Sequence, residues 1–286
     1  MANVRLFKPM DIPYEHFEVN GVPMSLLTGN EYSYSLIKNL DTSNNDTFLA
    51  SFPKSGTTWL LNIVFHLMGE DKNNQRVDDV VPWLDCDPYS VKPCGMMRYF
   101  KTHVPFSWLP YNENAKYIYV ARNPKDVAVS FYYFLEHMQD QVIGYKKENN
   151  IEMPSFIDYF GESRVLYGCW WEHVMSWYNA SLTNHNILFI TYEEMSNNIE
   201  SVISQIATFM SKIVSDDEIS CIAEKCAFRS MKNDKKSSMA YCKNFWRKGT
   251  CGDHVNFFTE DQIKYFDEKC ESLLPKELME RLNQIK

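Results

Sequence analysis

The sequence predicts an α/β fold in which helices flank both faces of a central parallel sheet. Apolar strand candidates at 47–51, 116–121 and 186–192 each precede a helical pattern. Repeated strand–helix units of this kind produce parallel sheets. The chain has 286 residues and is 45% hydrophobic. That is enough to bury one substantial core, so we expect residues 1–286 to form a single domain.

Charge and cysteine content narrow the class of protein. A net charge of −8 argues against a nucleic-acid partner bound through a basic surface. No uninterrupted apolar stretch reaches roughly 18 residues, so no membrane contact through a spanning helix is expected. Charges and prolines break the start MANVRLFKPMDIPYEHF, unlike a signal peptide. Eight cysteines without a C-x-x-C pair resemble reduced thiols. We expect a soluble cytoplasmic protein.

The segments around the first strands are predicted in order. Residues 1–46 form a lead-in, with a hairpin around Asn20-Gly21. An acidic, proline-marked loop at 78–93 is of the kind that often covers a binding site. A strand at 98–105 follows it.

The later segments are mostly helical. A helix is expected to begin near Lys125 and another to run over about 197–212. Between them, WWEHVMSWYNAS at 170–181 carries aromatic residues at helical spacing. Such spacing predicts core packing, and the same holds for Cys169 and His173, which share a helical face.

The most informative stretch is a P-loop-like strand–loop–helix, FPKSG at 52–56 followed by TTWLLNIVFHLMGE. Gly56 lets the backbone approach an anion closely, Lys54 adds a mobile charge, and the following helix presents unpaired N–H groups. The lysine precedes the glycine, unlike the order in nucleoside-triphosphate loops. The stretch therefore favours one phosphate that bears a reactive group. The alternative is a polar turn that caps a core helix.

Other polar groups lie where predicted strands end, which is where open α/β sheets bind ligands. Lys101 and His103 lie at the end of one strand, and Arg122 lies at the end of another. Ser130 follows Arg122 about two turns into the next helix. For His103 alone, a hydrogen-bonded structural histidine is the simpler interpretation.

A basic segment reverses the overall charge of the chain. Eight of the 29 Lys and Arg residues lie at 225–248, against one acid, Asp234. Most charge runs are solvated faces. This one ends in Arg247, Lys248 and Gly249, whose side chains and backbone N–H are suited to bind a second phosphate.

Together these motifs resemble the cytosolic sulfotransferases, which use 3′-phosphoadenosine 5′-phosphosulfate (PAPS) and leave 3′-phosphoadenosine 5′-phosphate (PAP). FPKSGTTW at 52–59 resembles the family's 5′-phosphosulfate loop, and KTHVP at 101–105 its catalytic-histidine strand. ARNPKDVAVS at 121–130 resembles the 3′-phosphate strand and helix, and FWRKGTCGD at 245–253 the C-terminal nucleotide loop. Their order and spacing match over nearly the whole chain.

The resemblance implies a role for each matching residue. The catalytic residues would be His103 as general base, Lys54 at the leaving oxygen, Lys101 and Ser130. The cofactor would be bound by Lys54, Ser55, Gly56, Thr57, Thr58, Trp59, Arg122, Ser130, Tyr192, Cys226, Phe228, Arg247, Lys248 and Gly249. Trp59 and Phe228 would flank the adenine. Since the leaving group is a stable phosphate anion, no metal is expected.

Three departures from the family's pattern have expected consequences. Cys226-Ala227 stands where a Thr-Ser pair is usual, which removes two hydroxyl contacts to the nucleotide. His254-Val255 replaces Trp-Lys. The family's dimer motif keeps only Thr259. We therefore expect a monomer or an altered homodimer.

The acceptor is expected to be a small phenolic or hydrophobic molecule with a hydroxyl or an amine. Its pocket would be lined by Phe17, Trp83, Lys101, His103, Phe131, Tyr133 and Phe134. Glu136 and His137 are weaker candidates for binding an amine, because both could face solvent. Two other functions are considered: a magnesium-dependent phosphotransferase or nucleotide hydrolase, and a non-catalytic nucleotide carrier.

Overall fold

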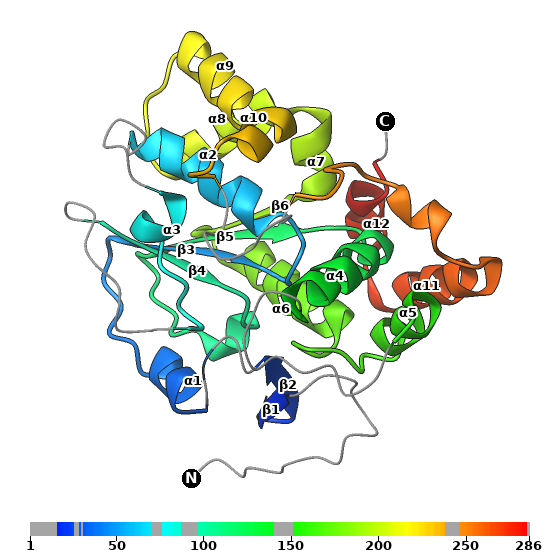
Figure 1. The fold of residues 1–286 in the computed structure, drawn as a ribbon. Helices are drawn as coiled ribbons and strands as arrows, with labels where there is room; N and C mark the ends of the chain where they lie inside the picture. Colours follow the sequence, from blue (N-terminus) through cyan, green and yellow to red (C-terminus); the bar gives the residue numbers. More distant parts are fainter. Residues whose placement is uncertain are drawn as a thin grey trace.

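The computed structural model describes residues 16–25, 29, 31–69, 76–86, 97–139, 151–237 and 246–284. Its centre is a parallel four-stranded sheet in the order β4-β3-β5-β6 (Figure 1). The strands are β3 (Asp46–Ser51), β4 (Arg98–Thr102), β5 (Lys116–Ala121) and β6 (Ile187–Thr191). The predicted parallel α/β fold is confirmed. The strand predicted at 98–105 is shorter than expected, because Pro105 has no N–H to donate to a ladder.

Alternate residues of the central strands enter two apolar clusters on opposite faces of the sheet. Leu49, Ile118 and Val120 belong to one cluster, whereas Phe48 and Tyr119 belong to the other. Successive side chains of a strand point to opposite faces, so both faces of this sheet are buried.

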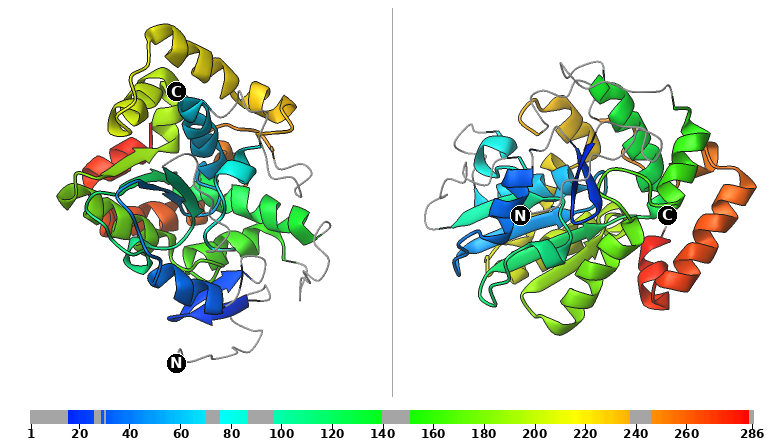
Figure 2. Two further views of the ribbon diagram at one scale, coloured as in Figure 1. Left: turned by 90° about the vertical axis from the view of Figure 1, so that its left-hand side faces the viewer. Right: turned by 90° about the horizontal axis from the view of Figure 1, so that it is seen from below.

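Helices from distant parts of the chain cover the two faces (Figures 1 and 2). The first face is covered by α2 (Thr57–Met68), α3 (Val77–Val80), α8 (Ile199–Phe209) and α9 (Asp216–Lys225). The second is covered by α4 (Pro124–Gln139), α5 (Met153–Gly161), α6 (Trp170–Thr183), α11 (Glu260–Leu273) and α12 (Lys276–Leu282). The remaining helices are α1 (Glu31–Lys38), α7 (Tyr192–Asn197), α10 (Phe228–Asn233) and the short 3₁₀ helices η3 (Phe106–Trp108) and η4 (Asp253–Asn256).

The predicted hairpin near the N-terminus is confirmed. Strand β1 (His16–Val19) pairs antiparallel with β2 (Val22–Ser25). Asn20 and Gly21 have φ of 52° and 79°, the left-handed pair that a two-residue hairpin turn requires. The hairpin contacts the main body where the Tyr167 N–H donates to the Pro23 carbonyl at 2.7 Å.

The helix predicted at about 197–212 is confirmed as α8, and the shorter helix α7 that precedes it was not predicted. Thr191 caps α7 through a capping box with Glu194, and that helix ends at Asn197. The Asn198 side chain then accepts a hydrogen bond from the Ser201 N–H and starts α8. An asparagine side chain that satisfies backbone donors favours a helix start over a helix interior.

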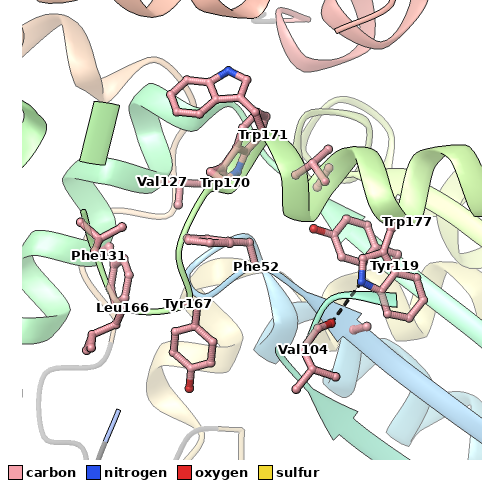
Figure 3. Close-up of a cluster of buried hydrophobic side chains, with 14 of the residues drawn as sticks. Phe52, Val104, Tyr119, Val127, Phe131, Leu166, Tyr167, Trp170, Trp171 and Trp177 are labelled. Carbon is pink, nitrogen blue, oxygen red and sulfur yellow. Dashed lines mark hydrogen bonds between the residues drawn. The ribbon is translucent and has the colours of Figure 1, made fainter. Parts of the chain in front are cut away.

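The predicted aromatic core of α6 is confirmed. Trp170, Trp171 and Trp177 are at most 1% exposed. Figure 3 shows Trp177 beside Tyr119 and Val104, and Trp170 next to Trp171. The Trp177 indole donates to the Val104 carbonyl at 3.2 Å. This hydrogen bond ties α6 to the segment that follows β4.

The acidic loop predicted at 78–93 is described only as far as residue 86. Its described part forms α3 and then pairs with β4: the Leu84 N–H donates to the Lys101 carbonyl at 2.8 Å, and the Lys101 N–H donates to the Pro82 carbonyl at 3.0 Å. Residues 87–93 lie outside the described part of the chain, as does Lys243 of the basic segment.

Candidate active site

The segment at 52–58, called the phosphate loop here after its predicted ligand, leads from the end of β3 into the first turn of α2. The Ser55 N–H donates to the Phe52 carbonyl at 3.2 Å and closes the turn. Lys54 and Gly56 both have positive φ, 68° and 108°. A Cβ on Gly56 would lie 2.7 Å from Cδ2 of Tyr192, so this position requires glycine for space as well as for conformation.

Unsatisfied donors gather in this loop, which fits a bound phosphate. The Ser55 hydroxyl and the Trp59 indole nitrogen are buried without a hydrogen-bond partner. The twelve-residue helix α2 begins with no side-chain cap on its N-terminus. Buried polar groups are normally paired, and helix N-termini attract anions. The Thr57 hydroxyl, in contrast, already shares a hydrogen bond with Ser51 Oγ at 2.5 Å.

His103 lies just beyond β4 and contacts the end of β3. Its Nδ1 is 2.8 Å from the Ser51 carbonyl oxygen. A carbonyl only accepts, so Nδ1 carries the proton and Nε2 is left as the basic nitrogen. Burial lowers the pKa of His103 well below its ordinary value, and the charge of Lys101 lowers it further. The imidazole is therefore neutral and able to accept a proton at physiological pH.

A buried carboxylate holds the backbone at His103. Asp85 accepts a hydrogen bond from the Thr102 hydroxyl at 2.5 Å and from the His103 N–H at 2.9 Å. Burial raises the pKa of Asp85 to about 6, although both hydrogen bonds oppose the shift. On the other side, His173 Nε2 lies 2.9 Å from the His103 carbonyl. His103 is thus held by groups from three other segments: Ser51 contacts its imidazole, and Asp85 and His173 hold its backbone.

Two aromatic rings flank the His103 imidazole edge to face. The Trp83 ring lies 5.4 Å away and the Tyr167 ring 5.8 Å away, centroid to centroid. Tyr167 has a left-handed backbone with φ of 69°, a strained conformation of the kind that concentrates at functional sites. Neither Asp85 nor Tyr167 was predicted, because no short motif marks them.

The predicted cations of the site lie over aromatic rings. The distances from cation to ring centroid are 4.4 Å for Lys54 over Phe134, 4.2 Å for Lys101 over Trp83, 4.0 Å for Arg122 over Tyr192 and 5.1 Å for Arg247 over Tyr133. Such contacts orient a cation at a gain of about 0.5–2 kcal/mol. Burial also lowers the pKa of the Lys101 ammonium.

The basic loop at 246–254 is attached to the first turn of α4. Arg122 Nη2 donates to the Thr250 carbonyl at 2.8 Å. Asp126 accepts hydrogen bonds from the N–H groups of Gly252 at 2.6 Å and His254 at 3.1 Å, and lies 2.9 Å from His254 Nδ1. Burial raises the pKa of Asp126, but hydrogen bonding to His254 and the charge of Arg122 lower it overall.

The loop's own cations are paired within the loop. Asp253 forms ion pairs with Arg247 and with Lys248, the latter at 2.7 Å. A Cβ on Gly249, whose φ is +69°, would lie 2.1 Å from Cδ2 of Phe228. The Phe228 ring therefore packs directly on the loop backbone.

The structure thus brings the separated motifs together. Ser51, at the end of β3, accepts a hydrogen bond from His103. The Tyr192 ring packs against Gly56 and lies under Arg122. Arg122 in turn donates a hydrogen bond to the basic loop. Arg122 Nη1 also lies 3.5 Å from the Lys54 carbonyl, so Arg122 contacts both loops directly.

Several predicted residues have surroundings that are mainly structural. Phe131 is 1% exposed, with its ring edges against Phe52 and Phe156. Cys226 is fully buried in the apolar cluster above α2, and burial raises its pKa to about 12. Their roles in binding stay predictions.

The other acceptor candidates are half-buried. Phe17 contacts the Tyr34 ring at 5.7 Å, and His137 Nδ1 lies 2.6 Å from the Tyr133 carbonyl. Glu136, Ser130 and Thr58 are half-buried as well, and the roles assigned to them from the sequence stay predictions.

In the part of the chain that the structure describes, no three His, Cys, Asp or Glu side chains are grouped so that they could hold a metal ion. Likewise, none of the helices in that part of the chain combines the length and the apolar character that crossing a membrane would need.

The chain is similar to known sulfotransferases. The family described as Sulfotransferase domain matches residues 44–283. Sulfotransferase 1E1 of Homo sapiens is 32% identical over 250 residues, covering 79% of this chain and 83% of that protein. The 3-beta-hydroxysteroid sulfotransferase of Cavia porcellus is 32% identical over 241 residues, covering 78% and 82%.

The fold is likewise that of a solved sulfotransferase structure. Mouse sulfotransferase SULT7A1, complexed with PAP, superposes with a TM-score of 0.77 at 27% identity, covering 94% of this chain and 98% of that chain. Because the family match begins before β3 and extends past α12, it contains the phosphate loop, the His103 strand and the basic loop. The chain therefore belongs to the sulfotransferase domain family, and its class of activity is that of a sulfotransferase.

Proposed function

We propose that this enzyme transfers the sulfonate group of PAPS to the hydroxyl or amine of a small phenolic or hydrophobic acceptor, by in-line displacement with His103 as general base. One observation carries the proposal: the His103 Nδ1 hydrogen bond to the Ser51 carbonyl at 2.8 Å. Ser51 is the last residue of β3 and leads directly into the phosphate loop. The base and the donor loop are therefore fixed to the same strand end.

The phosphate loop and the basic loop are suited to the two phosphate groups of the donor. The Ser55 hydroxyl and the N-terminus of α2 would hold the 5′-phosphate, and Arg122, Arg247, Lys248 and Gly249 the 3′-phosphate. When bound, PAPS supplies an activated sulfonate and a phosphate leaving group. The rings of Trp59 and Phe228, one at each loop, would contact the adenine. The PAP in the SULT7A1 structure supports this assignment.

The side chains near His103 would favour the transition state in two ways. Lys54 places a positive charge where negative charge develops on the leaving oxygen, and such charge stabilisation lowers the barrier. His103 Nε2 accepts the proton of the attacking hydroxyl. Lys101, held over Trp83 at 4.2 Å, adds positive charge on the acceptor side.

The acceptor class follows from the aromatic rings beside His103 and Lys54. Trp83 and Tyr167 flank His103, and Phe134 lies under Lys54, which favours a planar or hydrophobic acceptor. A relative named for a 3-beta-hydroxysteroid is consistent with a hydrophobic alcohol. Cytoplasmic location and a monomeric or altered dimeric state stay predictions from the sequence.

The proposal is tested by following sulfonate transfer from PAPS to a panel of phenols, steroid alcohols and amines. His103→Ala should lower kcat by about 10²- to 10⁴-fold, while PAP affinity measured by calorimetry stays within about twofold of wild type. His173→Phe is not a suitable control, because His173 positions the His103 carbonyl. Glu268→Gln on the exposed face of α11 is suitable, and it should leave the rate unchanged.

The same assay separates the alternatives. A phosphotransferase or nucleotide hydrolase would lose activity when magnesium is chelated. A nucleotide carrier would bind PAP but transfer nothing to any acceptor. Transfer that survives chelation and disappears in His103→Ala supports the proposal, and either of the other outcomes contradicts it.

A further inference from the structure

One carboxylate of the basic loop, Asp253, forms ion pairs with both cations of the loop, Arg247 and Lys248. Asp253 Oδ1 lies 2.7 Å from Lys248 Nζ, and Oδ2 forms the ion pair with Arg247 Nη1. The Asp253 side chain is 4% exposed, whereas those of Arg247 and Lys248 are 23% and 48% exposed. The carboxylate thus approaches the two cations from the protein interior and leaves their outer sides accessible.

Asp253 is a strong anion in this position. Burial alone would raise its pKa, but hydrogen bonds from Lys248, Arg247 and Asn256 bring it down to about 2. Asn256 Nδ2 donates to Oδ1 at 2.9 Å. This amide would remain with the carboxylate if the two cations turned elsewhere, so separation of the ion pairs would not strip Asp253 of every donor.

Arg247 and Lys248 are also the two side chains to which the proposed function assigns the 3′-phosphate. A cation shared between two anions binds each of them less strongly, and a phosphate near neutral pH carries about −1.5 to −2 charges against −1 for a carboxylate. The phosphate should therefore displace the carboxylate from the two cations, but the net free energy of binding is smaller than it would be without the carboxylate.

We infer that Asp253 is a built-in competitor of the donor's 3′-phosphate for Arg247 and Lys248, and that it determines how tightly the 3′-phosphorylated nucleotide is held. The inference rests on the proposed function. Its consequence is that the carboxylate weakens nucleotide binding and assists release of PAP, since it re-forms its ion pairs as the phosphate leaves.

A second carboxylate of the same region should act in the opposite direction. Asp126 accepts hydrogen bonds from the backbone N–H groups of Gly252 and His254, so it holds the loop in place and does not contact its outward-facing cations. Neutralising Asp126 should loosen the loop and weaken binding. Neutralising Asp253 should free the cations and tighten it.

The experiment is calorimetric titration of the full chain with PAP and with adenosine 5′-phosphate, which lacks the 3′-phosphate. Partly exposed ion pairs are individually weak, so Asp253→Asn should lower the Kd for PAP by about three- to tenfold. Its Kd for adenosine 5′-phosphate should not change. Glu268→Gln removes the same charge from an exposed pair on α11 and should change neither value.

Each outcome decides the matter. An unchanged or higher Kd for PAP in Asp253→Asn, with adenosine 5′-phosphate binding intact, overturns the inference. Wild-type protein that binds no PAP contradicts the proposed function instead. If Asp253→Asn does not fold, Asn256→Ala in a chain that keeps Asp253 is decisive. Loss of this amide leaves Asp253 more dependent on the two cations, so PAP should bind more weakly, and unchanged or tighter binding overturns the inference.

Discussion

The phosphate loop at 52–58 and the basic loop at 246–254 differ in how their anion-binding groups are held. In the first, the Ser55 hydroxyl is buried without a partner, and the loop is continuous with a central strand and a buried helix. In the second, Arg247 and Lys248 are paired with Asp253, and the backbone is held by α4. One region is preorganised by the local fold, and the other is assembled from distant segments.

Because of this difference, the two loops should contribute unequally to the free energy of nucleotide binding. A preorganised loop costs little to occupy, because its donors are already fixed and unsatisfied. An assembled loop must exchange internal ion pairs for those with the ligand, so its net contribution is smaller and adjustable. We expect substitutions in the first region to affect both the fold and the chemistry, and those in the second to affect mainly affinity.

The largest effect should come from Gly56→Ala. The new methyl group would lie 2.7 Å from the Tyr192 ring, at a φ of 108° that other residues rarely adopt, and such strain costs about 1–3 kcal/mol. We expect a lower melting temperature and at least roughly a tenfold loss of PAP affinity, measured by scanning and titration calorimetry.

Gly249→Ala is the matched comparison in the basic loop. Its methyl group would meet the Phe228 ring at 2.1 Å, but Phe228 is only half-buried and can move. PAP affinity should fall, and the melting temperature should fall less than in Gly56→Ala, because only the strain of the positive φ at Gly249 remains once the ring moves. Equal losses of stability in the two variants would show that the loops do not differ as described.

The next largest effect is expected at Asp85, which holds the backbone of His103. Asp85→Asn keeps the shape but replaces one carboxylate oxygen by an NH₂ group, which would face the Thr102 hydroxyl or the His103 N–H. Losing a buried hydrogen bond costs about 1–3 kcal/mol, so kcat should fall about tenfold with unchanged PAP affinity.

The split between kcat and affinity is the decisive feature for Asp85. Since burial raises the pKa of Asp85 to about 6, the wild-type rate should also decline as pH falls through 6, and this part of the pH profile should flatten in Asp85→Asn. If PAP affinity fell together with kcat, Asp85 would be a general structural residue and not one that positions His103.

The sequence predicts the preorganised region better than the assembled one. FPKSGTT fixes a strand end, a turn and a helix start within a few residues, so Lys54, Ser55 and Gly56 could be assigned from local chemistry. Three of the central strands were also found from their apolar runs, and the fourth from the polar residues at its end. The short helix α7 was missed, because six residues are too few to show a helical periodicity.

Long-range contacts carry no such local signal. The pairing of His103 with Ser51 spans 52 residues, and that of His254 with Asp126 spans 128. Asp85 and Tyr167 gain their positions only through tertiary packing. Asp253 was visible as a residue of the FWRKGTCGD motif, but its neutralisation of Arg247 and Lys248 depends on how the loop folds back.

A smaller effect on binding is expected from the buried contact between His254 and Asp126. His254→Leu removes the 2.9 Å contact from Nδ1 to the carboxylate but keeps the backbone bonds of the loop. A single hydrogen bond contributes about 0.5–1.5 kcal/mol, which corresponds to roughly a two- to tenfold weaker Kd for PAP. His254→Gln, which can still donate, should recover part of the affinity in the same titration. No loss in either variant would mean that Asp126 holds the loop through the backbone alone.

The smallest effect on donor binding, with a clear effect on stability, is expected at Glu193 beneath the basic loop. This carboxyl group is fully buried, and its Oε1 accepts a hydrogen bond from the Asn123 N–H at 3.0 Å. Burial raises its pKa to about 8, above the value of about 4.3 expected in the unfolded chain. Between these two values the native state keeps a proton that the unfolded state has lost, so the free energy of unfolding falls as pH rises through that interval.

Glu193→Gln cannot lose a proton and should therefore show a melting temperature several degrees above wild type at pH 8, but close to it at pH 4.5, by scanning calorimetry. If the melting temperatures of the two proteins change with pH in parallel, the pKa of Glu193 is not raised. The buried Glu193 carboxyl group would then be charged at neutral pH.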